Sequence, residues 1–166
     1  DAGNYTVVIT NLSGSVTSSV AVLTVNQSTA GQLVTLAGWN VSGLAAYGAS
    51  PLPPTTNAAN ITVVGLTRGA GVGTSGTAAG GAWGGNGFDS TNAVAAISAG
   101  DFATCSIAAN AGYTVSFTNI SRFDYRRSSG GPPNGVLQYQ IGNGSFTDIT
   151  TLSYSTTTSG GASLGP

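Results

Sequence analysis

The fold is indicated most clearly by the stretch Asn4-Tyr5-Thr6-Val7-Val8-Ile9-Thr10 and the turn residues Asn11-Leu12-Ser13-Gly14 that follow it. Apolar and polar residues alternate in this stretch, as they do in a strand, and Asn, Ser and Gly are typical of tight turns. A second such run covers residues 16–25, so the sequence predicts a β-hairpin. Apolar side chains fall on both of its faces, and they are Tyr5, Val7, Val8, Ile9, Val20, Val22, Leu23 and Val25.

The composition extends this prediction to the whole chain. Charged residues make up 5% of the 166 residues, hydrophobic residues make up 40%, and the formal net charge is -1. Disordered chains combine low hydrophobicity with high charge, so we expect this chain to fold. Few charged residues are available for the outer face of helices, whereas Val, Ile, Thr, Tyr and Phe recur between turn residues. We therefore predict an all-β fold.

Beyond the hairpin, residues 27–33 predict a polar linker and residues 34–166 a second module. Its strand candidates are residues 34–41, 60–66, 102–108, 113–120, 122–127, 136–141 and 146–149. One short helix is predicted over residues 93–97, with polar capping residues at 89–92 and Gly100 as its stop. We interpret as core the side chains of Trp39, Cys105, Tyr113, Phe117 and Tyr139.

The first residues carry a resemblance. Asp1-Ala2-Gly3-Asn4-Tyr5, followed by Leu23-Thr24-Val25, resembles the closing F and G strands of a bacterial immunoglobulin-like domain. In that fold a tyrosine hydroxyl bonds back to upstream backbone, and Val7 stands where disulfide-bearing members have cysteine. The resemblance implies that residues 1–26 are an immunoglobulin-like strand remnant.

The second module resembles a jelly-roll-like extracellular module of secreted bacterial surface proteins. The resemblance is carried by residues 65–69, 87–89, 101–102, 112–117, 126–132 and 137–139. It implies a β-sandwich at the cell surface or outside the cell, with no assigned activity to carry over. In that pattern further strands follow Ile149, and we expect residues 34–166 to lack these closing strands.

The chain lacks the residue types that most catalytic and metal sites require. Without histidine, Ser-His-Asp and Cys-His arrangements are impossible, and the five aspartates are the only acid–base candidates. Zinc clusters of Cys and His are missing as well. Four arginines form no basic stripe for nucleic acid, and no run of about 18 apolar residues predicts a membrane span. We expect a protein that is not an enzyme and has no cofactor, metal, nucleic-acid partner or membrane span.

Three weaker site hypotheses come from short motifs. Two aspartates could converge as a glycosidase pair. Residues 71–76 match the dinucleotide fingerprint, but no amphipathic helix follows, so we interpret them as a glycine-rich surface loop. Oxygen atoms of Asn86, Asp89 and Asn92 could bind calcium, although helix capping by Asp89 or Ser90 explains the same pattern.

Aromatic residues on polar loops suggest a sugar-binding surface. Trp83 is flanked by small residues in Gly80-Gly81-Ala82-Trp83-Gly84-Gly85, which leaves its ring approachable. The candidate platform for a carbohydrate consists of Trp83, Phe88, Tyr125, Arg126 and Arg127. Alternatively, Arg122, Arg126 or Arg127 forms a structural ion pair with Asp124 or a neighbouring aspartate.

These observations predict a structural or adhesive extracellular module that associates through β-strands with other copies or with adjoining domains, and that can extend into a filament. The apolar hairpin residues are the predicted self-association surface. The alternative is a carbohydrate-binding module of a larger secreted enzyme. Two explanations for the uncovered strand edges stay open: head-to-tail assembly of copies, or further sequence of a longer protein.

Overall fold

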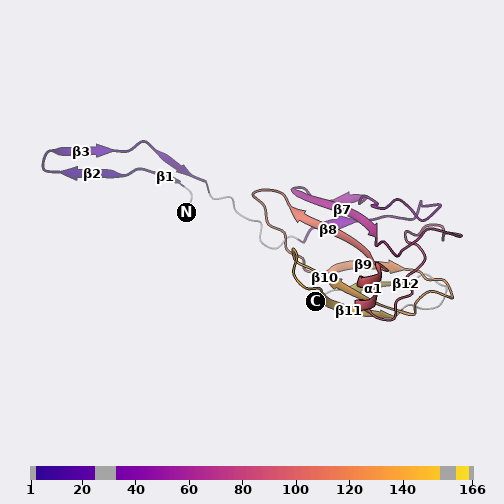
Figure 1. Cartoon of the computed structure of the whole chain (residues 1–166). Coiled ribbons are helices and arrows are strands. Elements are labelled where there is room, and N and C mark those ends of the chain that lie inside the picture. The colour runs from indigo at the N-terminus through magenta and orange to yellow at the C-terminus, as the bar shows by residue number, and fades with distance from the viewer. Residues whose placement is uncertain (1–2, 25–32, 154–159, 165–166) are drawn as a thin grey trace. The chain divides into compact units, whose positions relative to one another are not determined.

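The computed structural model describes residues 3–24, 33–153 and 160–164 (Figure 1). The contacts divide the chain into two units, Asp1–Val34 and Thr35–Pro166. Strands dominate both units, all the paired strands are antiparallel, and the described residues contain one short helix. The predicted all-β fold is therefore confirmed. Most of the predicted linker lies outside the described residues.

The first unit is the predicted hairpin. Strand β1 pairs with β4, and β2 pairs with β3. The bounds are Gly3–Tyr5 for β1, Val8–Asn11 for β2, Gly14–Thr17 for β3 and Ala21–Leu23 for β4. At the turn, the backbone N–H of Ser13 donates to Asn11 Oδ1 at 2.8 Å. This local hydrogen bond explains why Asn11 begins the turn.

The hairpin contains a one-residue irregularity near its middle. Val8 lies opposite Thr17 and Tyr5 opposite Ala21, so residues 6–7 of one strand face residues 18–20 of the other. The Ser18 N–H donates to Val7 O at 2.8 Å, and the Val7 N–H donates to Ser18 Oγ at 3.0 Å. These two bonds keep the strands joined across the extra residue, as in a β-bulge.

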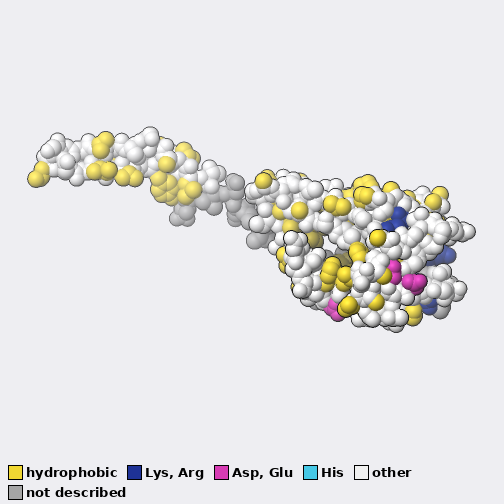
Figure 2. Space-filling view, in the orientation of Figure 1, with side chains coloured by type: hydrophobic (Ala, Val, Ile, Leu, Met, Phe, Trp, Pro, Cys, Tyr) yellow, Lys and Arg dark blue, Asp and Glu magenta, His cyan; other side chains and the backbone are white. Residues whose placement is uncertain are grey.

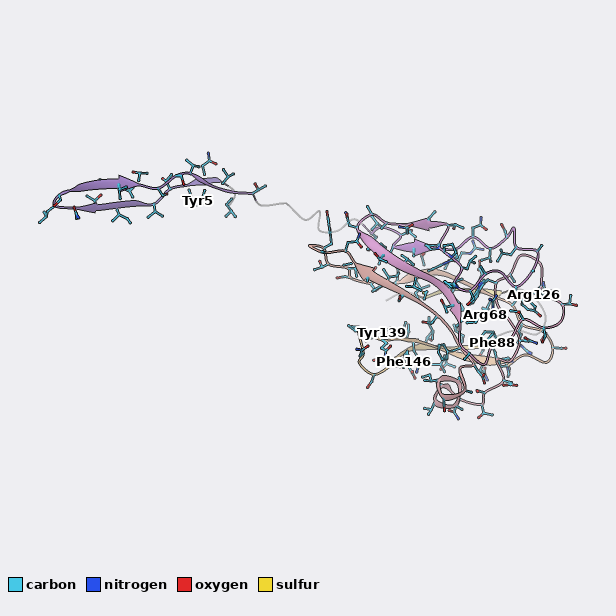
Figure 3. All side chains as sticks on the ribbon, turned by 45° about the horizontal axis from the view of Figure 1, so that its top comes forward. Tyr5, Arg68, Phe88, Arg126, Tyr139 and Phe146 are labelled. Atoms are coloured by element: carbon cyan, nitrogen blue, oxygen red, sulfur yellow. The ribbon has the colours of Figure 1, made fainter. Side chains whose placement is uncertain are left out.

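The second unit contains four antiparallel strand pairs: β5 with β6, β7 with β8, β9 with β12, and β10 with β11. Figures 1 and 3 show β7 and β8 in one layer and β9 to β12 in a second. Two layers are the arrangement expected of a β-sandwich, whereas the jelly-roll order of connections stays a prediction. The bounds are Ala37–Gly38 (β5), Thr56–Asn57 (β6), Ile61–Arg68 (β7), Ala103–Ala109 (β8), Ile120–Tyr125 (β9), Asn134–Tyr139 (β10), Thr147–Ser153 (β11) and Gly160–Leu164 (β12).

Helix α1 (Ala93–Ala99) confirms the predicted helix and corrects its cap. The N-cap is Asn92, whose Oδ1 accepts from the Ala95 N–H at 2.9 Å, rather than Asp89 or Ser90. Gly100 ends the helix in the left-handed conformation at φ 79°, and its N–H reaches carbonyls of the last turn. A residue with a side chain is disfavoured at this φ, which explains the glycine.

The strand predictions differ from the structure in several places, and of the strand predicted over residues 34–41 only Ala37–Gly38 (β5) forms. Residues 113–119 form no strand, because their alternating pattern finds no partner strand. Strand β6 was missed, since it is two residues long and follows Pro53 and Pro54. Strand β12, which was not predicted, lies beyond Ile149 and pairs with β9, whereas the absence of the closing strands of the jelly-roll pattern stays a prediction. Pairing with a distant strand, rather than any local pattern, places this Gly- and Ser-rich segment in a sheet.

The core of the second unit is small. Val72 and Leu152, which are 8% and 7% exposed, are the only buried large apolar side chains in the described ranges, and none there is completely buried. Close backbone packing at glycines adds to it: a Cβ on Gly65 would lie 1.8 Å from Leu52 O. Any larger residue at position 65 would therefore displace the segment around Leu52 from β7.

The core prediction was largely wrong. Cys105, Tyr113, Phe117 and Tyr139 are exposed. Trp39 is half-buried, and its Nε1 donates to Leu52 O at 2.9 Å. Alternation identifies which side chains share a face, but that face becomes core only when another layer covers it. Atoms around Cys105 still partly desolvate its thiol and raise its pKa, so the thiol stays protonated at neutral pH.

Candidate functional surfaces

The N-terminal hairpin exposes its apolar side chains. Every residue from Asn4 to Thr24 is exposed, including seven of the eight residues predicted for self-association, while Val25 lies outside the described residues. Ile9 is 65% exposed and Val22 is 72% exposed. Two further apolar residues of this surface, Leu12 at the turn and Val16 on β3, were not among the predicted ones. The hairpin therefore has no core of its own.

The strand register shows that both faces of the hairpin are apolar. Directly opposite residues share a face, so Ile9 lies beside Val16. In the β1–β4 pair, Tyr5 lies opposite Ala21, and Val22 lies opposite Asn4 on the other face. Because each face carries large apolar groups, one flat partner can cover only part of them.

The hairpin also has free strand edges. Among the described residues no third strand pairs with β1, β2, β3 or β4. The segment from Gly3 to Thr24 contains no charged residue and no proline. Charged side chains and prolines are the features that usually prevent an edge from pairing with another chain. The hairpin is therefore open to strand addition.

In the second unit, Trp83 is held by Arg68. The Arg68 guanidinium carbon lies 4.7 Å from the centroid of the Trp83 ring, a cation–π distance. The Trp83 Nε1 donates to Ala49 O at 2.7 Å. A Cβ on Gly48 would lie 2.7 Å from the edge of this ring, so glycine is needed for the ring to fit. The predicted sugar-stacking residue is half-exposed and fixed in orientation.

Arg68 joins two loops through their backbone carbonyls. Its Nε donates to Gly84 O at 2.5 Å, and its Nη2 donates to the carbonyls of Tyr47 and Gly48. Burial lowers the pKa of the guanidinium, which nevertheless stays charged at neutral pH. In the sequence, Arg68 stood out only as part of residues 65–69, which carry the resemblance to a jelly-roll-like module. The feature of the sequence that could have identified this role is a single arginine at the end of an apolar strand.

Two of the other predicted glycan contacts, Tyr125 and Arg127, make hydrogen bonds to backbone carbonyls. The Tyr125 hydroxyl donates to Ser153 O at 3.2 Å, and Arg127 Nη1 donates to Gly131 O at 2.9 Å, closing its own loop. Arg126 is exposed, and Figure 3 shows Arg68, Phe88 and Arg126 at the same end of the second unit. The predicted ion pair forms between Arg122 Nε and Asp124 Oδ2 at 2.6 Å, on an exposed surface.

The glycine motif at residues 71–76 forms a loop, as interpreted. Gly73 and Asn86 form an isolated antiparallel bridge, with both N···O distances at 2.9 Å. The Asn86 Nδ2 also donates to Ser75 Oγ at 2.8 Å. The end of α1 that adjoins this motif is its C-terminus, since the Gly71 N–H donates to the carbonyl of the C-cap Gly100 at 3.1 Å. The motif therefore packs two backbone segments together.

Two of the three candidate calcium ligands, Asn86 and Asn92, have structural partners. Asn86 holds Ser75, and Asn92 caps α1. The Ser90 hydroxyl donates to Asp101 Oδ2 at 2.5 Å, which ties the segment before α1 to the segment after it. In the part of the chain that the structure describes, no group of three or more Cys, Asp, Glu or His side chains gathers as metal ligands do.

A second apolar surface, which sequence reasoning missed, lies on the β10–β11 hairpin and its turn. We call it the β10–β11 patch, and it consists of Val136, Tyr139, Ile141, Phe146 and Ile149, between 41% and 80% exposed. Figure 3 shows Tyr139 and Phe146 beside each other, and Figure 2 shows hydrophobic side chains gathered over β10 and β11. The exposed aromatic residues distinguish this patch from an ordinary strand surface.

No helix among the described residues is long and apolar enough to cross a membrane. Comparison with protein-family models, with curated proteins and with solved structures finds no match for this chain. The resemblances to an immunoglobulin-like domain and to a jelly-roll-like module therefore stay predictions, and function has to be inferred from the surfaces described above.

Proposed function

We propose that the chain is a non-catalytic structural or adhesive module that associates with other copies of itself by β-strand association. The observation that carries this proposal is the exposure of the whole hairpin from Asn4 to Thr24. A two-stranded hairpin is marginally stable by itself in water. A partner that covers the apolar faces of the hairpin and pairs with its edges stabilises the hairpin, so association is thermodynamically favoured.

The apolar area of the hairpin, summed over both faces, is a large part of what one partner contributes to a stable interface. Burying a Val, Leu or Ile side chain contributes roughly 1.5–3 kcal/mol at roughly 25 cal/mol per Å², which corresponds to about 60–120 Å² each. The hairpin carries nine large apolar side chains that are at least half exposed. Together they present on the order of 500 Å², most of the roughly 800 Å² that each partner contributes to a stable interface.

The direction of association follows from the free edges. An edge strand without charges or proline accepts a strand of another chain, and main-chain hydrogen bonds then supply much of the affinity. If the hairpin meets a different surface of the next copy, each copy can bind two neighbours, and the assembly extends into a filament. An exported surface layer or fibre suits this behaviour, in line with the extracellular location predicted from the sequence.

The direct test is the mass of the purified chain across a concentration series. Sedimentation velocity is expected to show species larger than the monomer at tens of micromolar, and negative-stain electron microscopy is expected to show elongated assemblies. A single species at the monomer mass of 16.2 kDa throughout the series contradicts the proposal.

Carbohydrate binding at Trp83 is the second candidate, favoured by one observation. The Trp83 ring is fixed by Ala49 and Arg68, so stacking a sugar on it requires no ordering of the side chain. We expect any glycan-array signal of the chain to disappear in Trp83→Ala and to persist in part in Trp83→Phe, which keeps a ring. Circular dichroism spectra of both variants serve as the folding control, and an unchanged signal in folded Trp83→Ala contradicts this candidate.

A further inference from the structure

We infer that two copies associate through the outer edge of β2, the edge that faces away from β3, and that this edge pairs antiparallel with the same edge of the second copy. The inference rests on the proposed function, because it names the strand and the register of the same association. A two-fold axis at Ile9 relates the two copies, so that Ile9 of one copy lies beside Ile9 of the other.

The hydrogen bonds of the hairpin show which backbone groups of β2 are directed outward. The Ser18 N–H donates to Val7 O at 2.8 Å, so the backbone of Val7 points toward the other strand of the hairpin. In an antiparallel pair, successive residues point their N–H and C=O groups alternately toward the partner strand and away from it. Val8 and Thr10 therefore direct their backbone groups outward, and no described strand pairs with them on that side.

Two copies of this edge are complementary to each other. With Ile9 on the two-fold axis, Val8 of each copy lies opposite Thr10 of the other, and each such pair exchanges N–H···O=C hydrogen bonds in both directions. Strand β2 contains no charged residue, so its two copies do not repel each other. Two-fold contacts of this kind are the commonest in homo-oligomers, because the same surface serves both copies.

The same register aligns apolar side chains across the paired sheet. Ile9 lies opposite Val16 in its own hairpin, and directly opposite residues share a face. Pairing at Ile9 therefore produces an unbroken row of β-branched side chains that runs from Val16 of one copy through both Ile9 residues to Val16 of the other. β-Branched side chains pack well against their neighbours on a pleated surface, which stabilises this register.

The other edge of the hairpin is less suited to strand addition. The strand that carries it contains the extra residue between Thr17 and Ala21. Within this irregularity, Ser18 Oγ accepts from the Val7 N–H at 3.0 Å and donates to Ser19 O at 2.9 Å. Bulges twist an edge away from an incoming strand, and natural proteins use them to prevent pairing. The outer edge of β2 has no such interruption.

Edge pairing acts together with burial of the apolar faces. A few main-chain hydrogen bonds do not by themselves offset the freedom that two chains lose on association. The paired sheet still exposes apolar side chains on both faces, with Ile9 and Val16 on one and Val8 on the other. A second paired sheet can therefore pack on either face, and this stacking buries further exposed residues such as Val22 and extends the dimer into elongated assemblies.

Disulfide cross-linking tests the register directly. Cys105 is the single cysteine of the chain, so Ile9→Cys is made in the Cys105→Ser background. Residues directly opposite each other in a pair that is not hydrogen-bonded lie close enough for a disulfide. Under mild oxidation, at a concentration where the chain assembles, this variant is expected to form a covalent dimer on non-reducing gels.

Val16→Cys in the same background is the matched control. Val16 shares the face of Ile9 and is similarly exposed, at 63% against 65%, but lies on the other strand. We expect it to cross-link at least about tenfold more slowly, because two strands separate the two Val16 residues in the paired sheet. Equal rates overturn the inference. If the chain assembles and Ile9→Cys does not cross-link, β2 pairs with a different strand, such as the uncharged β10, and the inference is likewise overturned while the proposed function stands.

A pair of proline variants tests the edge without a cysteine. Thr10→Pro removes the outward N–H of β2, and Ser15→Pro, directly opposite, removes the outward N–H of the other edge. Both variants lose the hydrogen bond between the Thr10 and Ser15 hydroxyls, and proline is tolerated where the N–H faces solvent. Thr10→Pro is expected to raise the dissociation constant for assembly at least about tenfold, and Ser15→Pro to leave it unchanged. A loss that is equal in both variants, or confined to Ser15→Pro, overturns the inference, whereas a monomeric wild-type chain refutes the proposed function itself.

Discussion

Val22→Asp is expected to weaken self-association at least hundredfold. Val22 is 72% exposed and lies opposite Asn4, so the substitution removes little packing within one copy. Once a partner covers that face, the aspartate is buried without a counter-ion, which costs several kcal/mol. Because about 1.4 kcal/mol corresponds to a tenfold change in affinity, a loss of two or more orders of magnitude follows.

The measurement is the dissociation constant from sedimentation over a dilution series. The stability of the monomer should change by no more than about 0.5 kcal/mol, as for other exposed positions. Val22→Thr is a gentler variant that keeps the branched shape without a charge, and it should retain most of the association. If Val22→Asp assembles with wild-type affinity, the hairpin is not the interface.

Arg68→Ala is expected to destabilise the second unit by about 3 kcal/mol. The substitution removes hydrogen bonds from a charged donor to the carbonyls of Tyr47, Gly48 and Gly84, each worth about 1.5–3 kcal/mol when well formed. It also removes the cation–π contact with Trp83, worth about 0.5–2 kcal/mol. Because Arg68 and Trp83 are partly exposed, we expect a loss smaller than the sum of these contributions. A loss of about 3 kcal/mol is still large compared with a typical total stability of about 5–15 kcal/mol.

Urea unfolding followed by the fluorescence of Trp83 and Trp39 provides the measurement. Arg68→Lys should recover only part of the stability, because a single ammonium group cannot reach two loops as the planar guanidinium does. Arg126→Ala is the control, since Arg126 is exposed, and its midpoint should match the wild type. A midpoint for Arg68→Ala equal to that of the wild type shows that the two loops are held by other contacts.

Features that depend on near neighbours in the chain were predicted well. The hairpin turn requires only the Asn11 side chain and the next two residues, and the end of α1 requires only Gly100. The Arg122–Asp124 ion pair spans two positions on one strand. In each case the interacting groups are brought together by local geometry, so the residue types and their spacing were sufficient.

Features that depend on distant partners were not predicted. Strand β12 exists because it pairs with β9, and residues 113–119 form no strand because they have no such partner. Tyr139 was assigned to the core from its alternation, yet it is exposed on the β10–β11 patch. The pattern correctly grouped the residues of a face, but it carried no information on whether another layer covers it.

The amino-acid sequence by itself determined that this protein is built from strands, that residues 4–24 form an uncharged hairpin apolar on both faces, and that a short helix ends at Gly100. Only the tertiary structure decided that this hairpin has no core, that Arg68 joins two loops over Trp83, and that apolar side chains of β10–β11 stay exposed. The physical reason is the separation of the interacting groups along the sequence. Turns and caps are formed by hydrogen bonds between residues a few positions apart, whereas burial depends on which distant segments pack together.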